Sequence, residues 1–196
     1  MFSFRDLHTE AEHREFLDQF CAELTRRSAG ALELTIPTSR IARCTRVVGV
    51  FDRAGAMVGG YIVNRAPELI LLSVVPQGPR ETWLQRAPLE QQAELNLIWR
   101  NKGIGHTAFA LLVWTRIIYD CVTCGRPVIL GSGYENPLNR WYKIMGPEMI
   151  YAGPATSSGL TVYVYAYSRA KLIGTYAASF VDSFAAKPLR RLRGRR

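Results

Sequence analysis

The chain has 196 residues, of which 48% are hydrophobic and 21% charged, a balance typical of a globular domain with one sizeable core. No apolar run is long enough to cross a bilayer, and the N-terminus lacks the basic-then-apolar pattern of a signal peptide. We therefore expect a cytoplasmic protein. The formal net charge of +9 favours an anionic partner only if the positive residues are clustered, so their positions in the chain matter.

The first third of the chain predicts a helix and then a β-hairpin. Over residues 9–27 apolar side chains recur at intervals of three and four, and Thr9 precedes Glu12 as in a capping box, which predicts an amphipathic helix. The segments Thr45–Phe51 and Ala56–Val63 are strand-like and flank a turn with a glycine, which predicts a hairpin.

The middle of the chain begins with the apolar run Leu69–Val75, which lies among prolines and predicts a short strand within a long loop. Gln92–Trp99 then predicts a strand. The apolar segment Gly105–Cys124 predicts a long helix that ends at Gly125.

Short strands and helices alternate over the remainder. The predicted strands are Pro127–Leu130, Met149–Ala152 and Leu160–Tyr167, and the predicted helices are Asn136–Met145 and Lys171–Phe184. We expect the last helix to pack on the domain rather than on a membrane. Strands on both sides of a central helix predict an α/β (α+β) fold with a single mixed central β-sheet flanked by helices.

Six positive residues lie in the last ten positions, so we expect one domain over residues 1–184 and a basic, disordered tail over 185–196. Such a tail suits phosphates, acidic proteins or anionic lipid headgroups, or is simply solvated; we expect no specific nucleic-acid binding, because no aromatic residues are interleaved with it. Cys121 and Cys124 have metal-like spacing but no partner pair, so we expect no metal and reduced thiols.

The most informative segment is Arg100–Gly105, between a predicted strand and a predicted helix. Glycines there let the backbone approach a ligand, and the free N–H groups at the start of a helix attract an anion. Arg100 and Lys102 add positive charge. The spacing fits neither the nucleoside triphosphate loop nor the dinucleotide fingerprint, and an ordinary strand-to-helix turn is the alternative.

Here the chain resembles the GNAT superfamily of acyl-CoA-dependent N-acyltransferases, because Arg100, Gly103 and Gly105 match its Arg/Gln-x-x-Gly-x-Gly/Ala motif. The resemblance implies that the turn binds the pyrophosphate of coenzyme A and that backbone near Leu95 and Leu97 runs beside the pantetheine arm. The cofactor residues that it implies are Leu95, Leu97, Arg100, Asn101, Lys102, Gly103, Ile104, Gly105, His106 and Asn136.

A second match lies downstream, where Asn136 and then Tyr142-x-x-x-Gly146 follow the family's order. By the resemblance, Asn136 contacts the cofactor and the Tyr142 hydroxyl protonates the departing thiolate. Pro147 replaces the family's usual phenylalanine. The resemblance extends from Val47 to Tyr167 and implies a GNAT-like fold.

Amine acylation also needs a base, and Glu94 in the strand that enters the turn is the first candidate, with a solvated strand glutamate as the alternative reading. Glu68, Glu81 and Glu90 are weaker candidates. No Ser or Cys nucleophile has a convincing base, so direct acyl transfer is expected.

The sequence leaves both substrates open. The donor is acyl-CoA or an acyl carrier protein, and the acceptor is an amine of a small molecule, an amino acid or a peptide. The run Leu69–Val75 with Trp83, Trp99 and Trp114 either lines a tunnel for a longer acyl chain or packs in the core. The other functional reading is a non-catalytic module that binds acyl-CoA or a protein. The sequence does not set an oligomeric state.

Overall fold

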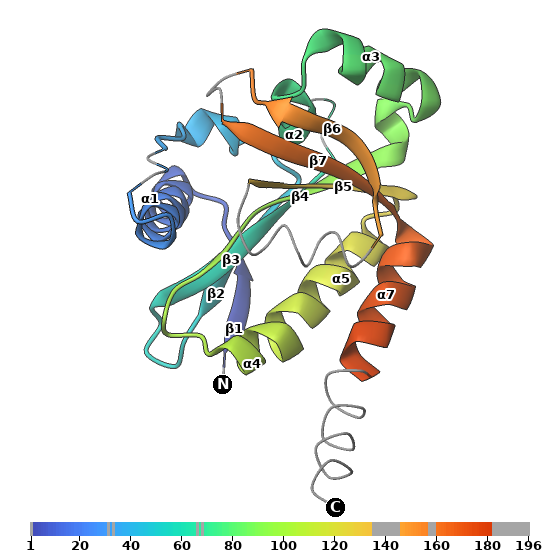
Figure 1. The fold of residues 1–196 in the computed structure, drawn as a ribbon. Helices are drawn as coiled ribbons and strands as arrows, with labels where there is room; N and C mark the ends of the chain where they lie inside the picture. The colour runs from blue at the N-terminus through green and yellow to red at the C-terminus, as the bar shows by residue number, and fades with distance from the viewer. Residues whose placement is uncertain are drawn as a thin grey trace, which may run out of the picture.

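The computed structural model describes residues 2–30, 32, 34–65, 67, 69–134, 146–156 and 160–181 (Figure 1). The strands are β1 (Ser3–Asp6), β2 (Arg46–Phe51), β3 (Met57–Asn64), β4 (Gln92–Arg100), β5 (Val128–Tyr134), β6 (Glu148–Pro154) and β7 (Thr161–Ser168). The helices are α1 (Glu10–Arg27), α2 (Ile70–Ser73), α3 (Gln77–Arg86), α4 (His106–Ala108), α5 (Trp114–Thr123) and α7 (Arg169–Val181). A π-helical turn, Phe109–Val113, joins α4 to α5, so residues 106–123 form one continuous helical segment.

The strands form one mixed seven-stranded sheet in the order β1-β2-β3-β4-β5-β7-β6. All neighbours are antiparallel except β4 and β5, which are parallel. This architecture confirms the predicted single mixed sheet flanked by helices.

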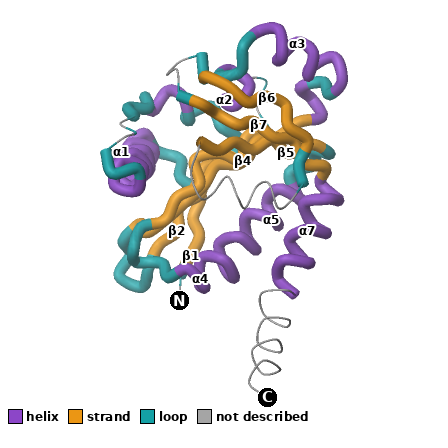
Figure 2. Tube along the Cα trace, viewed as in Figure 1, coloured by secondary structure: helices purple, strands orange, loops and turns teal. Residues whose placement is uncertain are grey.

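Helices cover both faces of the sheet (Figures 1 and 2). On one face, Phe16 of α1 packs edge-on against Trp99 of β4, with the ring centroids 5.9 Å apart. A β-carbon at Gly60 would lie 2.5 Å from the Phe16 ring, so this close approach of α1 to β3 depends on glycine. On the other face, α5 contributes Ile117 and Cys121 to the largest buried cluster.

A buried polar network fixes α5 to the sheet. The carboxylate of Asp120 accepts hydrogen bonds from the Tyr61 hydroxyl on β3 and from Arg46 Nη1 on β2, both at 2.6 Å. Arg116 Nε, one helical turn before Asp120, donates at 3.2 Å. Because Asp120 is buried and fully paired, the helix that follows the Arg100–Gly105 turn is held in a fixed position on the sheet.

Most predicted elements within the described residues are confirmed, including the first helix, the hairpin, the strand before the turn and the long helix after it. The predicted strand Leu69–Val75 is wrong: Ile70–Ser73 is the helix α2, and α3 and the short edge strand β1 were not predicted. An uninterrupted apolar run fits a buried strand and a buried helix equally well, which explains the error. The predicted helix Asn136–Met145 and the tail 185–196 lie outside the described residues.

Candidate functional site

Strand β4 separates from its parallel neighbour halfway along its length. Its pairing with β5 ends at Glu94 opposite Leu130, while β4 continues to Arg100. Among the described residues, β4 beyond this point is paired on its β3 side only. The backbone at Leu95 and Leu97, which the resemblance places beside pantetheine, therefore follows the point where the sheet opens.

A bulge interrupts β4 just after that point. The register with β3 shifts between Gly60 and Ile62, and Leu97 takes a φ of 45°. The Leu97 amide donates to Asn96 Oδ1 at 2.8 Å rather than to a strand partner. A left-handed leucine is uncommon, and strained backbone of this kind gathers at functional sites.

The turn after β4 is held by its own hydrogen bonds. Arg100 Nη1 donates to the Ile104 carbonyl at 2.7 Å, and the Gly103 amide donates to Asn101 Oδ1 at 2.7 Å. The Asn101 amide donates to the Val58 carbonyl at 2.9 Å, and the Ile104 side chain is fully buried. The turn is thus anchored at both ends without a ligand.

The two motif glycines differ in their surroundings. A β-carbon at Gly103 would lie 2.9 Å from Asn101 Oδ1 and 3.0 Å from Val58 Cγ1, so a larger residue here would need these two side chains to shift. At Gly105 a β-carbon would meet no heavy atom within 4 Å, and its φ of −61° suits any residue. Packing therefore gives no reason for glycine at position 105, whereas a ligand that approaches the backbone would.

Position 105 is also the N-cap of the helical segment 106–123. Gly105 has no side chain that could accept a hydrogen bond from the first turn, so the N–H groups there receive no cap. Lys102 and His106 are exposed on this turn, and Arg100 Nη2 lies 3.4 Å from His106 Nδ1. Uncapped N–H groups at the positive end of a long helix suit an anion.

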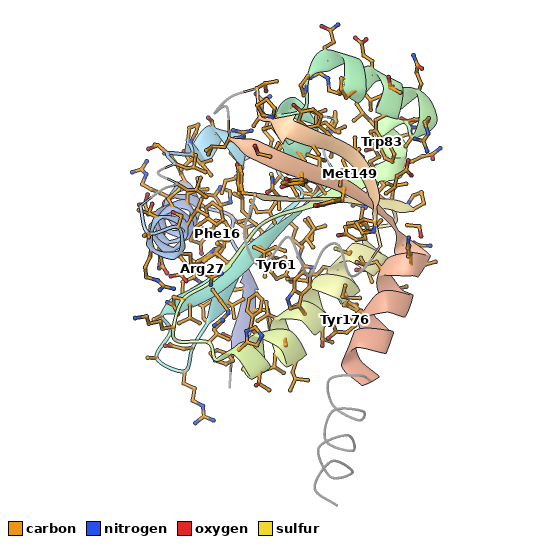
Figure 3. The ribbon with its side chains drawn as sticks, viewed as in Figure 1. Phe16, Arg27, Tyr61, Trp83, Met149 and Tyr176 are labelled. Carbon is orange, nitrogen blue, oxygen red and sulfur yellow. The ribbon has the colours of Figure 1, made fainter. Side chains whose placement is uncertain are left out.

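A further cation reaches this end of β4 from α1. Arg27, labelled in Figure 3, donates from Nη2 to the Arg100 carbonyl at 2.6 Å and from Nε to Glu23 at 2.7 Å. Burial, and then the charge of Arg27, lower the pKa of Arg100. The positive charges at this turn therefore repel one another, which a bound anion would relieve. Sequence reasoning missed Arg27, which carries no local signal for this contact.

Glu94 lies at the point where β4 and β5 separate, and its side chain is completely buried. Its carboxylate accepts hydrogen bonds from Asn64 Nδ2 at 2.8 Å, from the Ile70 amide at 2.9 Å and from the Leu71 amide at 2.7 Å. The alternative reading of a solvated strand glutamate is therefore wrong. Burial raises the pKa of Glu94, and this effect exceeds the lowering by its three donors. Nothing in the sequence indicated that Asn64 is a hydrogen-bond partner of Glu94.

The weaker base candidates Glu81 and Glu90 are both exposed to solvent. Asn136, Tyr142 and Glu68 lie outside the described residues. Trp83 and Trp99 are buried in separate clusters, and Trp114 is partly buried against the largest one, as the core-packing alternative expects. In the described part of the chain, no cluster of three or more His, Cys, Asp or Glu side chains could hold a metal ion.

No family model and no curated protein matches the sequence. Solved structures do match the fold. FeeM, an N-acyl amino acid synthase from uncultured soil microbes, is 11% identical over 89% of this chain and 94% of its own, with a TM-score of 0.67. The spermidine N-acetyltransferase from Vibrio cholerae, in complex with CoA and spermine, is 12% identical over 88% and 98%, with a TM-score of 0.54.

A GCN5-related N-acetyltransferase from Brucella melitensis is 11% identical over 90% of this chain and 81% of its own, with a TM-score of 0.54. At such low identities the likeness concerns the fold, and the three neighbours agree on it. The chain has the fold of the GNAT superfamily of N-acyltransferases, as its sequence motifs predicted.

Proposed function

We propose that this protein is an N-acyltransferase that moves an acyl group from acyl-CoA to an amine. The turn Arg100–Gly105 carries the proposal, because it joins an opened strand to an uncapped helix and leaves space at Gly105. The neighbour from Vibrio cholerae holds CoA in the same fold, which supports coenzyme A as the ligand.

In this proposal the pyrophosphate binds the amides from Asn101 to His106, with Arg100 and Lys102 as counter-charges. The pantetheine arm runs along the backbone of Leu95–Leu97, where β4 has no β5 partner among the described residues. Asn136 contacts the cofactor, as the resemblance implies.

The chemistry is a direct transfer. The amine nitrogen attacks the thioester carbon, Glu94 takes the proton of the amine directly or through a water, the carbon–sulfur bond breaks, and the Tyr142 hydroxyl protonates the thiolate. The raised pKa of Glu94 supports its role, since a general base works best when its pKa lies near the working pH. Among the described residues, Glu94 Oε2 accepts one hydrogen bond, from Leu71, and so keeps a lone pair for this proton.

An amino acid is the acceptor that we propose first, because FeeM is an N-acyl amino acid synthase and superposes with the higher TM-score of 0.67. The spermidine enzyme makes a polyamine the second acceptor to examine. Acyl-CoA is the proposed donor, and an acyl carrier protein is the alternative because its acidic surface would suit this basic chain.

The test is thiol release from acyl-CoAs of increasing chain length, mixed with amino acids and polyamines. We expect release that depends on the acceptor. CoA binding without release for any acceptor would favour the non-catalytic module, and the absence of CoA binding would contradict both readings. Native mass spectrometry of the purified protein identifies a retained acyl-CoA independently.

A further inference from the structure

The outward side of the helical segment 106–123 carries one charged side chain, Arg116, which is 35% exposed and whose guanidinium lies over the Tyr119 ring at 5.7 Å. Its exposed positions beyond the first turn are Leu112, Thr115, Tyr119 and Thr123. Leu112 is 47% exposed and Tyr119 58%. The acidic residue of the segment, Asp120, is buried and paired with Arg116. Helices that face water normally carry several charged residues on that side, so this stripe resembles a covered surface.

Helix α7 extends the same surface. It lies beside α5 (Figure 1), and the Tyr176 hydroxyl is 2.7 Å from Thr115 Oγ1, in the middle of the stripe (Figure 3). Ile173, three residues before Tyr176 and therefore on the same side of the helix, is 42% exposed. We call Leu112, Thr115, Tyr119 and Ile173 the α5–α7 face. It holds three of the five large hydrophobic side chains that are exposed in the described structure, so they are concentrated rather than scattered.

Positive side chains border this face where α5 ends and α7 begins. Arg65 Nη1 donates to the Cys124 carbonyl at 2.8 Å, and Arg169 Nη1 to the Val122 carbonyl at 3.4 Å. Exposed Lys171 follows in the first turn of α7. None of these three cations is in an ion pair with a described residue.

The sequence after Lys171 continues the pattern. The rest of α7, residues 172–181, contains no charged residue, and six Lys or Arg residues lie in the last ten positions of the chain. The partly apolar surface thus borders the described cations Arg65, Arg169 and Lys171. Apolar side chains next to cations favour peripheral binding to an anionic membrane.

We propose that the α5–α7 face rests on the surface of an anionic bilayer, with its apolar side chains among the acyl chains and the bordering cations Arg65, Arg169 and Lys171 at the headgroups. No described helix is long and apolar enough to cross a membrane, so the contact is peripheral. A second copy of the chain is the other possible occupant, and the experiment below separates it from a bilayer.

The experiment is co-sedimentation of the full-length protein with vesicles of phosphatidylcholine alone or mixed with phosphatidylglycerol. We expect binding to the mixed vesicles that falls with salt and is weaker on phosphatidylcholine alone. Leu112→Glu should lower the partition coefficient on mixed vesicles by about tenfold or more. Met149→Glu is the matched control: Met149 is 49% exposed on β6, away from Tyr176 (Figure 3), and its substitution changes the charge equally.

Equal partitioning of Leu112→Glu and Met149→Glu, or equal binding of the parent protein to both kinds of vesicle, would overturn the proposal. So would a dimer in vesicle-free solution that Leu112→Glu dissociates, because the face would then be a protein interface. Circular dichroism checks folding, and Leu112→Ser replaces the glutamate variant if that one does not fold. None of these outcomes depends on acyltransferase activity.

Discussion

Two helix N-termini lie next to β4, one earlier in the chain and one directly after it, and they differ in how their N–H groups are satisfied. At α2 the amides of Ile70 and Leu71 donate to the buried carboxylate of Glu94, so the protein supplies the anion itself. At α4 the N-cap is Gly105, which has no side chain, and the surrounding space is open. The comparison teaches that β4 provides an internal anion for one helix and leaves the other available to an external one.

The largest expected effect comes from changing Glu94, which accepts the hydrogen bonds of the α2 N-terminus. Glu94→Gln replaces one acceptor oxygen with a donor, so it removes the proposed base and weakens the bonds to α2 together. We expect turnover to fall by roughly a hundredfold to ten-thousandfold, with stability lowered by about 1–3 kcal/mol. Steady-state kinetics and chemical unfolding measure the two effects. Glu81→Gln, whose partner is the side chain of Gln77, is the control and should change neither.

A fall in stability without a fall in turnover per folded molecule would make Glu94 the anchor of α2 alone. The comparison between the two helix N-termini would stand, but the proposed base would have to be sought elsewhere.

Tyr142→Phe tests the proposed acid that completes the reaction. Removing the hydroxyl should lower turnover by roughly a hundredfold to ten-thousandfold with little change in the affinity for CoA. The loss should shrink when the thioester carries a more acidic thiol, since that leaving group needs less protonation. Kinetics with two thioesters measure this difference, and equal turnover of variant and parent would remove Tyr142 from the mechanism.

Gly105→Val tests the proposed anion site at the N-terminus of α4. A side chain there meets no protein atom but would occupy the place of the phosphate, so CoA affinity should fall about tenfold or more while the unfolding midpoint stays nearly constant. Gly78→Val is the control, because Gly78 also has no heavy atom near its β-carbon position. Gly103→Ala is a poorer test, since its methyl group would collide with Asn101 and Val58. Unchanged affinity in folded Gly105→Val would contradict the assignment of the turn.

These N-termini also show what the sequence could predict. The turn before α4 is contiguous in sequence, so its motif, and with it the proposed anion site, could be predicted from Arg100 to Gly105 alone. The cap of α2 comes from Glu94, which is distant in the chain, and the apolar run of α2 fits a strand as well as a helix, so the helix was not predicted. The role of Asn64 beside Glu94 likewise depends on the pairing of β3 with β4.

The N-terminus of helix α1 is capped by residues next to it in the sequence. A substitution there should have the smallest effect, and only on the free energy of unfolding. Thr9 Oγ1 accepts from the Glu12 amide at 3.2 Å, and Glu12 Oε2 accepts from the Thr9 amide at 3.0 Å, as the capping box predicted. Hydrogen bonds from the Thr9 and His8 amides lower the pKa of Glu12 from 4.5 to about 2. Because the folded pKa is the lower one, this stabilisation is present above pH 4.5 and is lost as the pH falls through about 2.

Glu12→Gln should therefore flatten the loss of unfolding free energy over that range, by about 1 kcal/mol or less because solvent screens the half-exposed carboxylate. Urea unfolding at a series of acidic pH values measures it, with Glu15→Gln on the same helix as the control. If the unfolding free energy falls with pH as steeply in Glu12→Gln as in the parent, the charge of Glu12 adds nothing to the cap.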